Sequence, residues 1–65
     1  MTTKLPSGNT LIEEENVSTR FVLLSGLGFG IEILENDFEK GSDEWANREI
    51  EIHERIKELS IPQPL

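Results

Sequence analysis

The sequence TRFVLLSGLGFGIEILE, residues 19–35, decides the fold because it holds two apolar runs separated by a glycine-rich connection. Both runs, 19–25 and 29–35, are rich in β-branched and aromatic residues, the composition typical of strands. Gly26 and Gly28 between them can adopt the positive φ angles that a tight connection between antiparallel strands needs. The stretch therefore predicts a β-hairpin.

The two predicted strands differ in how many faces they bury. Residues 29–35 alternate, with Phe29, Ile31 and Ile33 in one row, as in a strand with a single apolar face. Residues 21–24 are apolar at every position, a pattern typical of a central strand that is covered on both faces. The hairpin therefore predicts a sheet that needs a cover on each side.

Upstream of the hairpin the strand signal is weaker. Residues 10–17 open with Thr10, Leu11 and Ile12 before a run of glutamates, which predicts an edge strand, with the start of a helix as the alternative. Residues 1–9 are polar and contain Pro, Ser, Gly and Asn in a row, which favours a flexible arm. We therefore expect the sheet to lie within residues 10–35.

Downstream of the hairpin, residues 42–59 predict an amphipathic helix. Ser42 is a favourable N-cap, and Asp43 and Glu44 place negative charge at the positive end of the helix dipole. The two prolines near the end of the chain cannot continue a helix, so residues 60–65 are expected to form an extended tail. The apolar stripe recurs at helical spacing. It comprises Trp45, Glu49, Ile52, Ile56 and Leu59, widened by Ala46, Ile50 and His53, with Glu49 as its one polar interruption.

Together these patterns predict one domain, 1–65, of the α+β class: a small antiparallel β-meander of two or three strands followed by one C-terminal amphipathic helix across one face. A single helix can cover only one face of the sheet. If Phe21 and Leu23 point toward the helix, their neighbours point away and are exposed unless a second chain covers them. A two-fold homodimer would bury such a patch in both copies. The predicted self-association residues are Val22, Leu24 and Leu34.

Charge is the second strong feature of the sequence. Thirteen acidic residues against six basic ones give a net charge of −7. Residues 32–45 hold six of the acids against the single Lys40, and so carry −5 of this charge. Nucleic acid is a poor direct partner for such a chain, because neutralising phosphates needs clustered Lys and Arg. The pattern favours a larger protein with a basic surface as the partner.

No pattern of catalytic or ligand-binding residues is complete in the sequence. Without Cys and with His53 alone, one chain can form neither a disulfide nor a Cys/His zinc site. The glycine run fails the dinucleotide-binding pattern G-x-G-x-x-G because its third glycine falls on Ile31, and residues 53–57 begin like H-E-x-x-H but end on a lysine. An EF-hand loop centred on Gly41 would place Asn47 where a bidentate Glu is needed. The sequence therefore predicts no enzymatic activity, no cofactor and no metal.

Targeting patterns are equally weak. The first 20 residues include three consecutive glutamates and lack the apolar segment of a secretory signal. The longest uncharged apolar stretch, 21–31, is about half the ~20 residues that a transmembrane helix requires. The absence of Cys fits a reducing compartment. We therefore expect a cytoplasmic protein without a membrane span.

Two function classes fit these patterns. The first is a small acidic regulator or inhibitor that docks the acidic segment on a basic surface of a larger protein, with mimicry of nucleic-acid charge as one version. Its alternative is a solvated loop with helix-capping carboxylates. Trp45 is a candidate apolar anchor, with core packing as the alternative. The second class is a self-associating assembly subunit. The predicted partner-binding residues are Glu32, Glu35, Asp37, Glu39 and Trp45.

Overall fold

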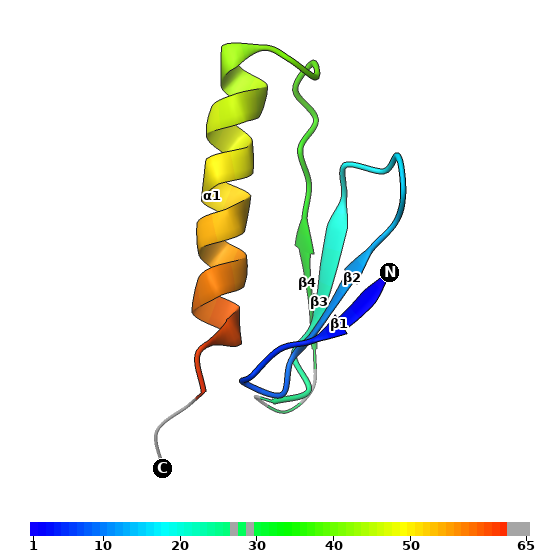
Figure 1. The fold of residues 1–65 in the computed structure, drawn as a ribbon, viewed down its shortest axis with the longest axis vertical. Coiled ribbons are helices and arrows are strands. Elements are labelled where there is room, and N and C mark those ends of the chain that lie inside the picture. The colour runs from blue at the N-terminus through cyan, green and yellow to red at the C-terminus, as the bar shows by residue number, and fades with distance from the viewer. Residues whose placement is uncertain (27, 29, 63–65) are drawn as a thin grey trace.

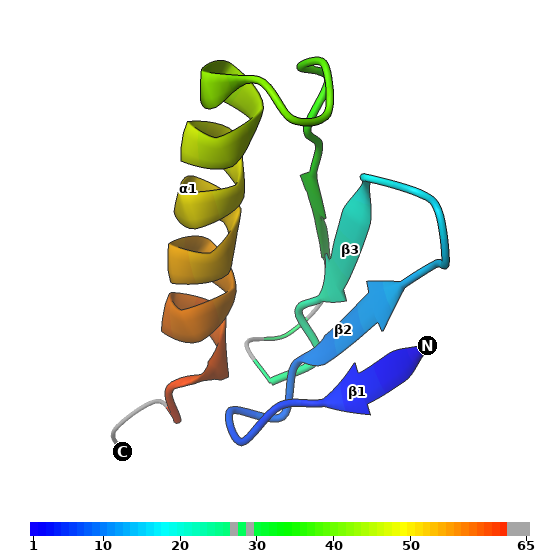
Figure 2. The ribbon, with the colours of Figure 1, turned by 45° about the horizontal axis from the view of Figure 1, so that its top comes forward.

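The computed structural model describes residues 1–26, 28 and 30–62, which form an antiparallel sheet with one helix alongside (Figure 1). The elements are β1 Thr2–Lys4, β2 Thr10–Glu13, β3 Arg20–Leu23, β4 Ile31–Leu34 and α1 Asp43–Ser60. The strands follow one another across the sheet in chain order, and each pairs antiparallel with its neighbour. The helix runs along one face (Figure 2). The α+β class is thus confirmed, with four strands instead of two or three.

The helix forms where the sequence predicts it. Its N-cap is Ser42, whose Oγ accepts the Trp45 backbone N–H at 3.1 Å, and two acids occupy its first turn. It ends at Ser60, one residue beyond the predicted boundary. The β3–β4 hairpin also forms as predicted, although Leu27 and Phe29 in its connection lie outside the described residues.

The N-terminal residues form a strand where the sequence suggests an arm. In β1, Thr2 pairs with Ile12, so that β2 lies inside the sheet and is not an edge strand. The turn-forming residues connect the two strands: the Leu5 N–H donates to the Asn9 carbonyl at 2.8 Å, and Gly8 takes a φ of 95°. The three residues are polar and exposed, so the alternation of apolar and polar residues that marks a half-buried strand is missing.

The core is a single layer between α1 and one face of the sheet. Val22 in β3 and Ile52 in α1 are both 0 % exposed. Leu5, Leu24 and Ile56 are partly buried and pack against this layer. So thin a core is expected for a domain of this size. The buried apolar residues are Leu11, Val22, Leu34, Ile52 and Leu59.

The face of the sheet that packs against the helix is the opposite of the one that the sequence predicts. Directly paired residues share a face of an antiparallel sheet, and the register places Leu11, Val22 and Glu32 in one row on the helix side. Val22 and Leu34 therefore belong to the core, and Leu24 packs against it. The expectation that these three residues form an exposed patch is wrong.

Two ion pairs between residues far apart in the sequence account for this reversal. Arg20 and Glu32 lie on the helix side, where they meet Glu49 and Arg55 of α1. Side chains alternate between the faces along a strand, so the apolar neighbours of Arg20 and Glu32 point away from the helix. The sequence pattern predicts those apolar rows on the helix side because Glu49 and Arg55, the partners of the two charged residues, lie far away in the chain.

The buried side-chain amide of Asn9 links the β1–β2 and β3–β4 connections to the C-terminal end of α1. These three segments meet at one end of the sheet (Figure 1). Asn9, 1 % exposed, donates through Nδ2 to the Leu59 carbonyl at 2.8 Å and accepts the Gly26 N–H through Oδ1 at 3.0 Å. Ser7 Oγ donates to the same Leu59 carbonyl at 2.5 Å. Gly26 has no room for a side chain, because a Cβ there would lie 2.2 Å from the Ser7 carbonyl oxygen.

We predict that Asn9→Ala lowers the free energy of unfolding by about 1–3 kcal/mol, because it leaves the Gly26 N–H without its partner and removes one of the two hydrogen bonds to the Leu59 carbonyl. Chemical denaturation followed by circular dichroism measures the change. The control is Asn47→Ala at an exposed helix position, which should leave stability unchanged or slightly raised because Ala is the better helix former. Equal stability of Asn9→Ala and the wild type would contradict the role of this amide.

Candidate functional site

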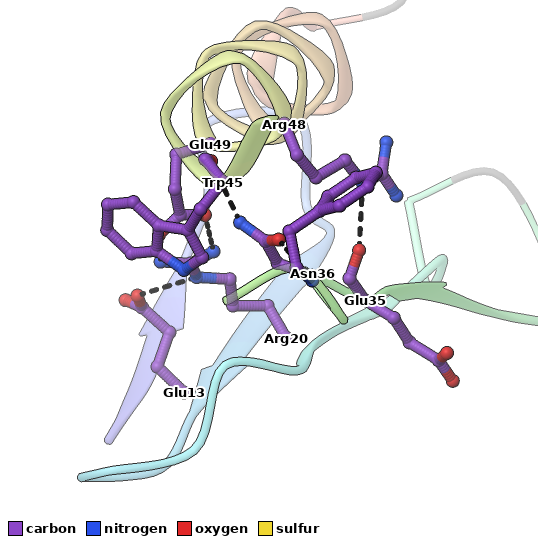
Figure 3. Close-up of polar contacts among 8 residues, drawn as sticks. Glu13, Arg20, Glu35, Asn36, Trp45, Arg48 and Glu49 are labelled. Atoms are coloured by element: carbon purple, nitrogen blue, oxygen red, sulfur yellow. Dashed lines mark hydrogen bonds and ion pairs between the residues drawn. The ribbon is translucent and has the colours of Figure 1, made fainter. Parts of the chain in front are cut away.

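A pair of charged side chains joins the sheet to the first half of the helix (Figure 3). Arg20 on β3 donates to both carboxylate oxygens of Glu49 on α1, at 2.5 and 2.9 Å. Both side chains are only 15 % exposed, so salt screens this pair less than a pair on the open surface. Glu13 on β2 lies 3.8 Å from the same guanidinium. One arginine thus lies between two carboxylates and offsets part of their charge.

A second pair joins the edge strand β4 to the second half of the helix. Arg55 donates to both carboxylate oxygens of Glu32, at 2.6 and 2.7 Å, and to Glu58 at 3.2 Å. Glu32 is one of the predicted partner-binding residues, yet its carboxylate is turned toward α1. The negative charge of Glu32 is therefore offset within the fold.

The hydrogen bonds from the arginines change the acidity of these groups. Arg20 holds the pKa of Glu49 below its ordinary value of 4.5, and Arg55 does the same for Glu32, while burial opposes both shifts. The hydrogen bond that Arg20 donates to Glu49 in turn raises the pKa of Arg20. Both pairs are consequently ionised at neutral pH.

The connection between β4 and α1, residues 35–42, is held at both of its ends. Asn36 is buried, donates to the Trp45 carbonyl at 3.1 Å and accepts the Phe38 N–H at 3.3 Å (Figure 3). At the other end, Ser42 caps the helix. Because both ends are fixed to the first turn of α1, the connection presents its side chains in a defined arrangement.

Five exposed carboxylates gather around this connection, and we call them the acidic end. None of them forms an ion pair within the described residues. Phe38, 52 % exposed, lies between two of them in the chain. Two cations are near: Lys40, and Arg48, which donates to the Glu35 carbonyl at 2.8 Å. The acidic end comprises Glu35, Asp37, Glu39, Asp43 and Glu44.

Trp45 is partly buried beside Arg20 and Glu49, outside the core layer (Figure 3). These residues line an open hollow of about 250 Å³ together with Lys40 and residues 16–18. The indole Nε1 is buried and has no hydrogen-bond partner among the described residues. Ligand pockets usually measure about 300–1,000 Å³ and enclose most of their ligand, so this hollow does not define a ligand site.

The predicted partner-binding residues do not form one site. Three of them, within residues 35–39, lie together on the acidic end. Glu32 faces α1, and Trp45 lies on the Glu13 side of the close-up, away from the Glu35 carboxylate (Figure 3). Sequence reasoning passed over Phe38, whose only signal is a large apolar residue between two acids in a polar connection.

In the described part of the chain, no group of three or more His, Cys, Asp or Glu side chains is placed to hold a metal ion. No helix within residues 1–62, leaving out 27 and 29, is long and apolar enough to cross a bilayer. His53 is exposed on α1.

We predict that Glu49→Gln lowers the free energy of unfolding at neutral pH by about 1–3 kcal/mol, since it removes a charge-assisted hydrogen bond from Arg20. The variant should also flatten the loss of stability in acid. A lowered pKa in the folded state means that the unfolded state binds more protons. The contribution of Glu49 is therefore complete above pH 4.5 and lost as the pH falls through its lowered pKa.

Urea unfolding at several pH values between 7 and 2 tests this expectation. The control is Glu54→Gln, which changes an exposed carboxylate on the same helix and should keep the wild-type acid dependence. An acid dependence of Glu49→Gln identical to that of the wild type would show that the pair with Arg20 contributes nothing to folding.

Comparison with known proteins identifies no relative. No protein-family model, no curated protein sequence and no solved structure matches this chain.

Proposed function

We propose that the protein is a small acidic binding module, a regulator or inhibitor that docks its acidic end on a basic surface of a larger protein. The observation that carries this proposal is the separation of the carboxylates into two sets. Those between sheet and helix are paired with arginine, whereas the five of the acidic end have no ion pair within the described residues. The field of the acidic end is available to a partner.

The charge balance supports the same function. Five carboxylates of the acidic end stand against Lys40 and Arg48, which leaves a local charge of −3. A cationic surface would be attracted to this end of the molecule, and the attraction would raise the rate of association more than it slows dissociation. Mimicry of nucleic-acid charge is one version, in which the carboxylates take the place of phosphates.

The order of the connection supports tight binding at low entropic cost. Asn36 fixes the start of the connection, and the Ser42 N–H and Oγ donate to the Glu39 carbonyl at 3.0 and 2.6 Å. A loop that is already ordered loses less conformational entropy when it binds. Phe38 would provide the apolar contact at the centre, with the charges as the rim.

Self-association is the second candidate function, because the described residues leave a contiguous apolar sheet face uncovered. The two functions use different surfaces and do not exclude one another.

We predict that neutralising three carboxylates of the acidic end weakens the partner complex at least about tenfold, because it removes most of the local attraction. The immobilised protein would capture its partner from a lysate of its source cells, and titration of that partner would measure the affinity. Binding by the wild type should weaken as salt shortens the Debye length from about 30 Å at 0.01 M to about 8 Å at 0.15 M. The variant is Glu35→Gln, Asp37→Asn and Glu39→Gln.

A control variant removes the same number of charges elsewhere. It should bind as the wild type does, whereas Phe38→Ala should bind more weakly. Equal binding by both triple variants, or capture that salt does not affect, would show that the acidic end only solubilises the protein. The control changes are Glu14→Gln, Glu15→Gln and Glu54→Gln, all at exposed positions without an ion pair in the described residues.

A further inference from the structure

The face of the sheet that α1 does not cover is apolar, and we call it the outer sheet face (Figures 1 and 2). Its most exposed members are Leu23 at 38 %, Ile31 at 52 % and Ile33 at 51 %. Ile12 and Phe21, on the same face, are partly exposed. Five large apolar side chains thus point away from the helix.

The strand register makes these side chains one continuous patch. Ile12, Phe21 and Ile33 stand opposite one another across β2, β3 and β4. Leu23 and Ile31 form the adjacent row. Neighbouring strands lie about 4.8 Å apart, so the five side chains adjoin with no polar residue between them. Single exposed apolar residues are ordinary, but a contiguous patch of this kind marks a contact surface.

The outer sheet face also lacks negative charge, although the chain carries −7. The acids of the strands, Glu13 and Glu32, lie on the helix side with their arginines. The polar residues that share the outer face are Thr2, Lys4 and Thr10, by their pairing with Ile12 and Leu23. Two copies can therefore bring these faces together without opposing their carboxylates. The exposed surface of α1, with Glu51, Glu54 and Glu58, offers no such approach.

We propose that the outer sheet face is the interface of a two-fold homodimer, in which two sheets pack face to face with the helices outside. A two-fold interface lets one apolar patch satisfy itself in both chains. Sheets packed in this way stand about 10 Å apart, which the interdigitated side chains of two apolar faces fill. This inference rests on the second proposed function, self-association, to which it gives an interface, and it is independent of the docking of the acidic end.

The size of the two cores favours a second copy over a larger partner. Each protomer has five buried apolar side chains of its own among the described residues, and the dimer would enclose five more from each chain. Domains below about 70–80 residues rarely gain enough from a single core and commonly use oligomerisation. Disulfides are not available to a chain without Cys.

The area of the face sets the strength of the dimer. Four strands of about four residues span roughly 19 by 13 Å, or about 250 Å² in the plane for each copy. A standard interface buries about 800 Å² of accessible surface on each partner, more than a face with this small flat footprint can bury, so this dimer belongs to the weak and reversible class. We therefore expect it to dissociate on dilution in the micromolar range.

Sedimentation velocity from 1 µM to 1 mM tests the proposal. The wild type should move from 7.4 kDa toward twice that mass as its concentration rises. The double variant Ile31→Thr and Ile33→Thr should dissociate at least tenfold more readily. Threonine keeps the β-branched shape that strands favour, and these side chains do not belong to the protomer core. Leu23→Thr is a milder variant of the same face, expected to weaken the dimer about threefold.

The matched control is Ile50→Thr, an isoleucine of similar exposure, 57 %, on α1. It should dimerise as the wild type does, and all variants should retain the wild-type circular dichroism spectrum at 1 µM. Three results would each overturn the proposal: a wild type that stays monomeric up to 1 mM, variants of the outer sheet face that dimerise like the wild type, and a control as strongly affected as they are. Flotation of a monomeric wild type with phosphatidylcholine vesicles would identify a lipid surface as the occupant instead.

Discussion

A single helix can cover only one face of a four-stranded sheet, and this constraint governs the rest of the molecule. The layer in which Val22 and Ile52 are fully buried is the core of the described chain. Two ion pairs, Arg20 with Glu49 and Arg55 with Glu32, also join the sheet to the helix. All remaining apolar side chains of the strands must then lie on the side without a helix.

The same constraint separates the surfaces of the protein by chemistry. Two of the three arginines lie between sheet and helix, where they pair with Glu49 and Glu32, and few cations remain for the connection that precedes the helix. The negative field therefore concentrates at one end, and the outer sheet face is left without acids. An acidic end suits a partner of opposite charge, whereas an apolar face suits a copy of itself. The two surfaces can act at once because neither uses a residue of the other.

Local signals in the sequence predict the elements better than they predict their facing. The N-cap Ser42 and the two prolines after the helix mark α1 to within a residue, and the glycines mark the β3–β4 hairpin. The sequence does not predict β1, because its three polar residues show no alternation of apolar and polar side chains. The facing of β3 and β4 depends on Arg20 and Glu32 meeting partners 29 and 23 residues away, which no local pattern records. For the same reason Glu32 looks available in the sequence and is paired in the fold. The acidic end was predictable, since its charges lie close together in the chain, within residues 35–44.

The facing of the sheet is the central claim, and nuclear Overhauser effects between methyl groups test it most directly. The account predicts strong effects from the methyl groups of Val22 and Leu34 to those of Ile52 or Leu59, and none from Ile31 or Ile33 to the helix. These contacts report the core of the protomer and hold whether or not it dimerises. The opposite pattern, with Ile31 and Ile33 against α1 and Val22 free of it, would contradict the account, because the apolar face would then be covered and no uncovered one would remain.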